Sequence, residues 1–554
     1  MAHPKTDVEI AQAHTLEPVA DIAAKAGVPD DALIPYGRSM AKVDVTRLDA
    51  PADGKLVLVT GVSPTPAGEG KSTVLIGLTD ALAQLGHKAA VALREPSLGP
   101  VMGIKGGAAG GGYAQVVPME NINLHFTGDF HAITSANNTL AAMIDNHIQH
   151  GNALRIDARR ITWQRCLDVN DRSLRNVVTG LGGPGSGLPA ETGFTITAAS
   201  EIMAILGLAT DIEDLKRRLA AITVGFTFDK EPVTAGDLHA EGAMAALLKD
   251  AVNPNLVQTL GGTPAFIHGG PFANIAHGCN TLIATRTAQQ SADIVLTEAG
   301  FGSDLGAEKF FDIKARYGDL DIAGAVIVAT IRSLKYNGGA AKQELTDENL
   351  DALRGGAANL ERHVENVRKF GIEPVVALNL FTSDTDAERE FMRGWADDFG
   401  VALEEAEVWA KGGDGAVALA EKLLGTLGSG TSKPLYDPAE GVEASIRTIA
   451  REIYRADDVQ YSAAALRDLQ TLKDNGWDTL PVCISKTQYS FSDDPSALGA
   501  PEGHTLHIQR LLPRTGAGFV VVLTGDVMTM PGLPKVPAAN NIDVDADGTI
   551  SGLF

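Results

Sequence analysis

Residues 65–73 have the residue types and spacing of a loop that binds phosphate groups. The segment consists of Thr65, Pro66, Ala67, Gly68, Glu69, Gly70, Lys71, Ser72 and Thr73. In the general pattern G-x-x-x-x-G-K-[ST], backbone N–H groups surround the phosphate oxygens and the lysine reaches the β- and γ-phosphates. The hydroxyl that follows the lysine reaches Mg²⁺. The loop therefore predicts nucleotide binding, although Thr65 stands where the pattern has its first glycine.

A strand and a helix must flank such a loop, and the sequence predicts both. The run at 55–61 is apolar and rich in β-branched residues, which is typical of a buried parallel strand. After the loop, apolar residues recur on one helical face up to Leu85, and Gly86 is placed to end the helix. A second strand at 88–93 completes a β-α-β unit. A glycine-rich turn without a ligand is the alternative, and the Lys-Ser-Thr end of the loop favours nucleotide binding.

Two charged residues follow predicted parallel strands. Arg94 comes directly after the run at 88–93, and Glu298 closes the run that begins at Asp293. Because ligands of open α/β sheets bind at the carboxyl ends of strands, both side chains are expected beside the loop. The planar guanidinium of Arg94 suits a carboxylate or an acyl phosphate, with an ion pair to Glu95 as the alternative. Glu298 is a candidate neighbour of Mg²⁺, and a salt bridge is its alternative.

Other candidates rest on weaker patterns. Asp129 and His131 are plausible acid–base or orienting residues, although loop residues of this kind more often only hold structure. The six glycines among residues 103–112 fit a mobile loop over a ligand, and nearly as well a flexible linker. Phe381 and Trp409 stand at the ends of predicted segments, where a ring can stack on a flat heterocycle. From the residues alone, core packing is the favoured interpretation of both rings.

Composition limits the class of protein. The chain has 554 residues and a net charge of −23, which argues against a nucleic-acid-binding protein. Its three cysteines lack metal-ligand spacing and fit the reduced thiols of a cytoplasmic protein. The first residues lack the apolar stretch of a signal peptide, and no apolar run has the length of a transmembrane helix. We therefore expect a cytoplasmic protein with neither nucleic acid nor membrane as partner.

Alternation of strand-like and helical patterns predicts an α/β fold. Further strand-like runs occur at 293–297, 324–330, 374–379 and 518–524. We expect a main domain with a phosphate loop and a parallel sheet over residues 1–310. Two smaller α/β domains would cover residues 311–430 and 431–554, with the Gly/Ser-rich stretch at 427–434 as linker.

Longer segments resemble the formate–tetrahydrofolate ligases, also called formyltetrahydrofolate synthetases, of the monofunctional type. The similarity covers essentially the whole chain and is carried by residues 65–73, 94–100, 266–279, 297–309, 528–535 and 552–554. Thr65 departs from the general phosphate-loop pattern but resembles the form that the loop has in this family. Leu380 departs from the family, since a polar or basic residue is expected after Asn379.

The resemblance implies that ATP, formate and tetrahydrofolate give 10-formyltetrahydrofolate, ADP and phosphate through formyl phosphate. It implies that Lys71 and its loop hold the ATP phosphates and that Lys71 and Arg94 hold formyl phosphate. Phe381 and Trp409 would stack on the folate ring, against the core packing favoured above. MgATP would be a substrate, with Ser72 and Glu298 on the metal side. A monovalent cation, no tightly bound organic cofactor and a homotetramer are also implied.

This chemistry fits the charges. Formate is already an anion at neutral pH, so it needs no base to attack the γ-phosphorus, and the enzyme must instead overcome repulsion between anions. In the second step the folate N10 attacks the formyl carbon, and Asp129 or His131 is our candidate to receive the N10 proton. The main alternative is a phosphate-loop ATPase or GTPase that acts as a switch or maturation factor. A scaffold with a vestigial loop conflicts with the intact Lys-Ser-Thr sequence.

Overall fold

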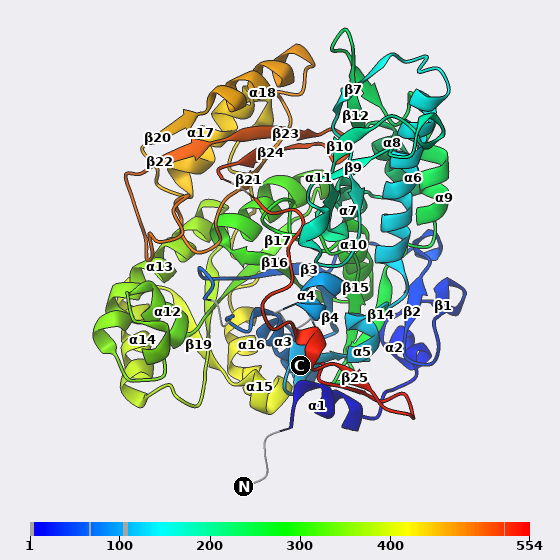
Figure 1. Cartoon of the computed structure of the whole chain (residues 1–554). Helices are drawn as coiled ribbons and strands as arrows, with labels where there is room; N and C mark the ends of the chain where they lie inside the picture. The colour runs from blue at the N-terminus through cyan, green and yellow to red at the C-terminus, as the bar shows by residue number, and fades with distance from the viewer. Residues whose placement is uncertain (1–4, 66–67, 104–108, 526, 554) are drawn as a thin grey trace.

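A large, twisted sheet runs through the middle of the protein (Figure 1). The computed structural model describes residues 5–65, 68–103, 109–525 and 527–553. The main path of the 12-stranded sheet follows the order β1 (Leu33–Pro35), β2 (Ala41–Val43), β14 (Asn255–Thr259), β15 (Pro264–Ile267), β4 (Ala89–Leu93), β16 (Ile294–Gly302), β3 (Lys55–Gly61), β17 (Ile322–Ala329), β18 (Pro374–Asn379) and β19 (Ala402–Ala406).

From β15 to β19 along this path, each strand is parallel to the next one. β3, which leads into the phosphate loop, lies in the centre between β16 and β17, with Val59 opposite Glu298 on one side and Val326 on the other. The remaining edge is antiparallel, where β14 pairs with β15 and with β2. Because all the parallel strands end at the same edge, the segments that follow them meet there.

Both faces of the sheet are buried under helices. Leu56 and Leu58 of β3 belong to one apolar cluster, and Val57 and Val59 belong to another, because successive side chains point to opposite faces. On the Val57 side lie α3 (Lys71–Gln84) and α16 (Val417–Leu424), and on the Leu56 side α10 (Leu282–Ser291) and α13 (Leu350–Lys369). Burial on both faces explains why β3 reads as a continuous apolar run.

Two further parts flank the sheet (Figure 1). One contains α6 (Asp129–Gln149), α7 (Glu201–Leu208), α8 (Ile212–Ala220), α9 (Glu241–Leu248) and a small sheet of β7 (Ile156–Ile161), β12 (Thr223–Thr227) and β13 (Pro232–Thr234). The other contains α17 (Val442–Glu452), α18 (Ala463–Asp474), β20 (Asp458–Tyr461), β21 (Val482–Ser485), β22 (Thr505–Ile508), β23 (Arg510–Arg514) and β24 (Phe519–Leu523). The chain then returns to α1 (Asp7–Ala13), where the Gln12 side-chain amide donates to the Ile550 carbonyl at 2.7 Å.

The predicted α/β class with a mostly parallel sheet is confirmed. The strand predicted at 55–61 is β3, and the run at 374–379 is β18. The predicted domain limits stay predictions. β3 pairs with β17, so strands from before and after residue 310 belong to the same sheet. Within the described ranges, no helix is both long enough and apolar enough to cross a membrane.

Candidate active site

Most of the predicted site residues lie at the carboxyl edge of the parallel sheet. Arg94 follows β4, and the phosphate loop follows β3. Phe381 follows β18, and Trp409 follows β19 in the short helix α15 (Val408–Lys411). Glu298 lies in the middle of β16, and β16 lies between β4 and β3 in the sheet. Sheet order therefore brings together residues that are far apart in sequence.

Two glycines of the predicted phosphate loop have the backbone conformation that favours glycine. Gly68 and Gly70 have φ values of 80° and 70°, in the left-handed region that favours glycine. Gly70 also begins α3, and a β-carbon there would come within 2.5 Å of the Asn379 side-chain nitrogen. Glu69 accepts a hydrogen bond from the Thr65 N–H at 2.8 Å, which closes the loop on itself. Pro66 and Ala67, also predicted to bind nucleotide, lie outside the described residues.

Lys71 is held by the neighbouring strand. Its Nζ donates to the Phe301 carbonyl at 2.8 Å. Phe301 has a φ of 62°, which is strained for a bulky residue. The strain coincides with an irregular register between β16 and β3, where Glu298 pairs with Val59 and Gly302 with Gly61. The extra length of β16 between these pairs accommodates the left-handed residue whose carbonyl meets Lys71.

Glu298 is the centre of the charged group. It is fully buried, and its two oxygens accept from Ser72 Oγ at 2.8 Å and from Arg94 Nε at 3.2 Å. Burial by itself raises the pKa of Glu298, but Arg94, Lys71 and Ser72 together outweigh it and hold the pKa below its usual value. The carboxylate is therefore ionised at neutral pH. Lys71, Arg94 and Glu298 together leave one net positive charge at the strand ends, which suits an anionic ligand.

The metal-side prediction has a compatible donor set. Ser72 and Glu298, both predicted on the Mg²⁺ side of the nucleotide, are in direct contact and offer only oxygen donors. Mg²⁺ prefers oxygen ligands and is commonly held by one or two carboxylates together with substrate phosphates. Among the described residues no cluster of three or more His, Cys, Asp or Glu side chains could hold a metal by itself. The site therefore fits a metal that arrives with its nucleotide.

Asp129 and His131 differ in their surroundings. Asp129 is the first residue of α6 and is buried, with its oxygens 2.7 Å from Lys42 Nζ and 2.8 Å from the Asn255 amide nitrogen. Burial, and then the nearby Asp129 charge, raise the pKa of Glu95 well above its usual range. His131 is exposed. Asp129 thus belongs to a buried ion pair that reaches Glu95 beside Arg94, and a role for either residue in proton transfer stays a prediction.

The two predicted folate-stacking rings are both accessible. The Trp409 side chain is 46% exposed, so core packing is the wrong interpretation of this residue. Its carbonyl accepts from the Tyr113 N–H at 2.8 Å, and its ring lies against Gly112 of the glycine-rich segment. Phe381 is half-buried, with the Arg332 guanidinium carbon 4.1 Å from its ring centre. Residues 104–108 of the segment expected to form a mobile loop lie outside the described residues.

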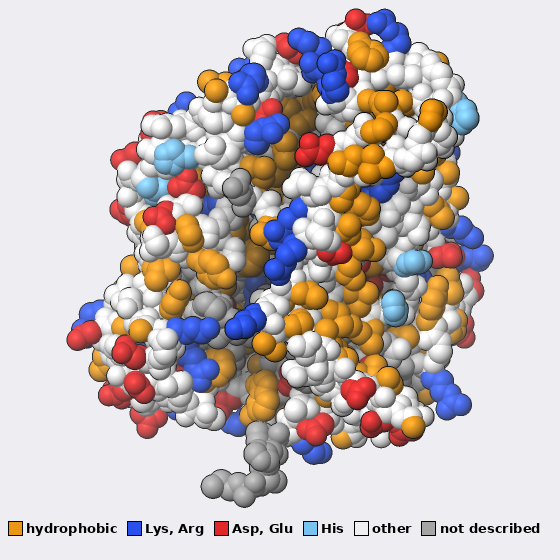
Figure 2. Space-filling model, in the orientation of Figure 1, with side chains coloured by type: hydrophobic (Ala, Val, Ile, Leu, Met, Phe, Trp, Pro, Cys, Tyr) orange, Lys and Arg blue, Asp and Glu red, His pale blue; other side chains and the backbone are white. Residues whose placement is uncertain are grey.

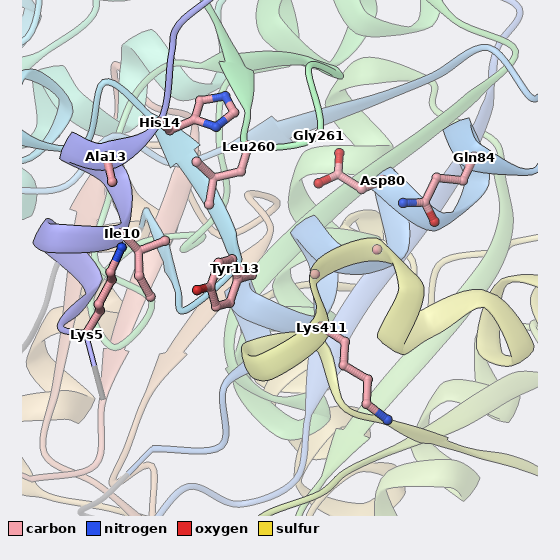
Figure 3. A pocket seen from close by; sticks show the side chains of 12 residues that line it. Lys5, Ile10, Ala13, His14, Asp80, Gln84, Tyr113, Leu260, Gly261 and Lys411 are labelled. Carbon is pink, nitrogen blue, oxygen red and sulfur yellow. The ribbon is translucent and has the colours of Figure 1, made fainter. Parts of the chain in front are cut away.

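A pocket of about 340 Å³ lies between α1 and α3 (Figure 3). Asp80 and Gln84 of α3 line it together with Tyr113 and Lys411, and α1 forms the opposite wall. Of the predicted site residues that the structure describes, none lines this pocket. The Tyr113–Trp409 hydrogen bond connects it to the strand-end site described above.

The surface agrees with local concentration of positive charge. Figure 2 shows a hollow that runs down the middle of one face, with Lys and Arg side chains along it. The whole chain nevertheless has a net charge of −23. Local cations of this kind attract an anionic substrate despite the overall charge.

Sequence reasoning missed several contributors. Lys42 stands between Ala41 and Val43 in a buried strand, and a lysine inside an apolar run was the available signal. Phe301 is flanked by Gly300 and Gly302, which could have indicated an irregular strand end. Arg94 pairs with Glu298 rather than with Glu95, which was the expected alternative.

Comparison with known proteins identifies the family of the chain. The profile of the family "Formate–tetrahydrofolate ligase" matches residues 5–554. Proteins named formate–tetrahydrofolate ligase from Corynebacterium diphtheriae and Corynebacterium jeikeium are 71% and 68% identical, over 99% of this chain and 100% and 98% of their own lengths. One from Staphylococcus carnosus is 59% identical over 99% of both chains. The chain therefore belongs to the formate–tetrahydrofolate ligase family.

Proposed function

We propose that Lys71, Arg94 and Glu298 form the phosphoryl-transfer centre of a formate–tetrahydrofolate ligase. The reaction follows from family membership: formate is joined to tetrahydrofolate with ATP, giving 10-formyltetrahydrofolate, ADP and phosphate. The observation that carries the assignment of residues is the buried Glu298 carboxylate, which joins Ser72 of the phosphate loop to Arg94 of the adjacent strand.

In the first step a formate oxygen attacks the γ-phosphorus of ATP, and the bond from that phosphorus to the ADP oxygen breaks. ADP leaves with the electron pair, and formyl phosphate remains. Two unit charges of the same sign 4 Å apart repel by about 4 kcal/mol at an effective dielectric constant of 20. Such a term would slow the reaction by about 10³-fold. Lys71 and Arg94 oppose it, and Mg²⁺ bound with ATP supplies further neutralisation.

Glu298 orients Arg94, and the two cations together still exceed its single negative charge. Its charge is shared between Ser72 and Arg94, and Lys71 is held separately by the Phe301 carbonyl. Arg94 retains access to the solvent side, since 22% of its side chain is exposed. Fixed donors of this kind stabilise charge in the transition state with little reorganisation.

In the second step the lone pair of the folate N10 attacks the formyl carbon. The bond from that carbon to the phosphate oxygen breaks, and phosphate leaves with the oxygen that came from formate. Phe381 and Trp409 hold the folate ring by stacking. Asp129 and His131 are the candidates for the N10 proton, and the ion pair with Lys42 favours an orienting role for Asp129. Turnover of Asp129→Asn and His131→Ala distinguishes the two.

The family resemblance supports several further parts of the proposal. Subunits assemble as a homotetramer, a monovalent cation activates the reaction, and no organic cofactor is tightly bound. The enzyme works in the cytoplasm. Residues 1–310 bind ATP and formyl phosphate, residues 311–430 contribute to the folate site, and residues 431–554 form the small C-terminal domain. Light scattering after size-exclusion chromatography tests the tetramer, and turnover in potassium against lithium salts tests the cation.

The assignment of residues is tested by substitution. We expect Lys71→Met and Arg94→Lys to lower kcat by about 10²–10³-fold, because each removes a donor aimed at developing charge. Arg510→Lys is the matched control. Arg510 is half-exposed and pairs with Asp468 at 2.6 Å, and both residues are far in sequence from those of the candidate site. Product is measured as methenyltetrahydrofolate absorbance after acidification. Unchanged kcat in the Lys71 and Arg94 variants would refute the assignment, and ATP hydrolysis without formate would favour a nucleotide switch.

A further inference from the structure

A buried histidine connects the two strands that carry the phosphate site. His363 belongs to α13 and has no solvent exposure. Its Nδ1 lies 3.2 Å from the Ser303 backbone nitrogen and 2.7 Å from Ser303 Oγ. Its Nε2 lies 3.2 Å from Ser63 Oγ. Ser303 directly follows β16, and Ser63 lies two residues beyond the end of β3, so the imidazole bridges both strand ends.

The hydrogen bonds determine the tautomer of His363. A backbone N–H can only donate, so Nδ1 must present its lone pair to Ser303. Burial lowers the pKa of His363 to about 4, with Asp304 opposing this effect, so the ring is neutral at pH 7. Its single proton is then on Nε2 and is donated to Ser63 Oγ. The Asn359 amide donates to the same oxygen at 3.0 Å, which fixes the Ser63 side chain from a second direction.

The Ser303 side of this bridge is close in sequence to the residue that binds Lys71. Ser303 lies two residues after Phe301, whose carbonyl accepts the Lys71 hydrogen bond. Gly302, between them, is packed on the imidazole: a β-carbon there would lie 2.7 Å from His363 Cε1. The left-handed Phe301 backbone persists only if surrounding contacts hold it. The contacts of His363 with Gly302 and Ser303, one and two residues after Phe301, provide such support.

The Ser63 side is close to the other end of the same site. Ser63 lies two residues before Thr65, the first residue of the phosphate loop. His363 is 300 positions from Ser63 and 60 from Ser303, so one side chain ties together segments that local sequence does not relate. The ring is held in turn by Phe491, whose centre lies 4.8 Å from it.

We propose that His363 is a positioning residue for phosphoryl transfer. As the neutral Nε2–H tautomer it holds the Phe301 carbonyl and the entry to the phosphate loop in fixed relation, so that Lys71 points at the transferred group. This inference rests on the proposed role of Lys71. Because misplacement of a catalytic group by about 1 Å can cost about 10²-fold in rate, the effect is expected in kcat and not in the KM for MgATP.

Three substitutions separate the two contacts. The amide of an asparagine can take the place of Nδ1 and keep the contact with Ser303, whereas the longer glutamine can take the place of Nε2 and keep the contact with Ser63. Alanine keeps neither. Val364→Ala is the matched control, because Val364 is fully buried on the same helix and belongs to the apolar cluster. Thermal midpoints are measured for every variant.

We expect His363→Ala to lower kcat by about 10²-fold while the KM for MgATP changes less than threefold. His363→Asn should retain more activity than His363→Gln, because it keeps the contact nearest to Phe301. Val364→Ala should lower the thermal midpoint and leave kcat within threefold of wild type. ADP is measured in the same samples as the formyl product. If the wild-type protein forms ADP without the formyl product, the proposed function is wrong. The effect of the His363 substitutions on the rate of ADP formation can still be measured in that case.

Two results would overturn the role of His363. One is a kcat within threefold of wild type in His363→Asn, His363→Gln and any folded His363→Ala. The other is a loss of kcat that follows the thermal midpoint in the same way for the His363 variants and for Val364→Ala. Either result assigns His363 to fold stability alone.

Discussion

Replacement of Glu298 by glutamine removes one negative charge from the centre of the site. Glu298 is fully buried, 3.2 Å from Arg94 Nε and 2.8 Å from Ser72 Oγ. Glutamine has nearly the same shape, so the substitution removes charge with little change of volume. The guanidinium of Arg94 would lose its buried partner, and Ser72 would lose a charged acceptor.

The size of the effect follows from burial. Removal of one partner of a buried ion pair costs about 3–5 kcal/mol. Because 22% of the Arg94 side chain is exposed and can be hydrated, we take the lower limit, about 3 kcal/mol. With about 2.1 cal/mol/K of unfolding entropy per residue, 554 residues carry about 1.2 kcal/mol/K, so the thermal midpoint falls by about 3 °C. Loss of about 2 kcal/mol of charge-assisted orientation lowers kcat about thirtyfold.

The assay combines thermal unfolding with steady-state kinetics at pH 7. Glu443→Gln is the matched control, because Glu443 is 41% exposed and pairs with Lys473 at 2.8 Å, and exposed pairs contribute about 0–1 kcal/mol. The pKa of Glu298 lies below its usual value, so its contribution to stability is present at neutral pH and disappears as the pH falls through that lowered pKa. The difference in thermal midpoint between wild type and Glu298→Gln should therefore become smaller as the pH falls. A midpoint and a kcat equal to those of Glu443→Gln would refute the reasoning.

The remaining predictions concern stability, folate binding and thiols. Burial raises the pKa of Asp80 to about 6, so ionisation of Asp80 lowers the free energy of unfolding as the pH rises through that value. Asp80→Asn should therefore be more stable than wild type by about 3 kcal/mol at pH 8. Equal midpoints at pH 8 would count against this, and the two proteins should converge at pH 4. Phe381→Ala and Trp409→Ala should each raise the KM for tetrahydrofolate about tenfold and leave the KM for MgATP unchanged, because only folate stacking is lost; a change confined to MgATP would exclude stacking. Burial also raises the pKa of all three cysteine thiols, so a disulfide reagent at pH 8 should find no reactive thiol until the protein unfolds; rapid labelling of the native protein would contradict this for Cys166, Cys279 and Cys483.

Local sequence predicted the parts of the site that local physics determines. β3 is apolar because both of its faces are buried, and Gly68 and Gly70 are required by the left-handed backbone of the loop. Arg94 was expected at the carboxyl edge of the sheet because parallel strands share their carboxyl ends, and it follows β4 there. These are properties of single segments, so one sequence was enough.

Contacts between distant segments could not be predicted in the same way. Glu298 pairs with Arg94 because β16 lies between β4 and β3. The order of strands in the sheet differs from their order in the chain, so the sequence does not predict this neighbour. The left-handed Phe301 depends on the register between β16 and β3. His363 contacts both strand ends only because α13 packs against them. Each of these features arises from tertiary packing.

We propose that this site makes formyl phosphate from formate and ATP. It is tested most directly by running the reaction with formate labelled with ¹⁸O in both oxygens and analysing the released phosphate by mass spectrometry. Because the attacking formate oxygen stays on phosphorus when N10 displaces phosphate, we expect one ¹⁸O in each phosphate formed, in proportion to 10-formyltetrahydrofolate. Unlabelled phosphate accompanying the formyl product would contradict it.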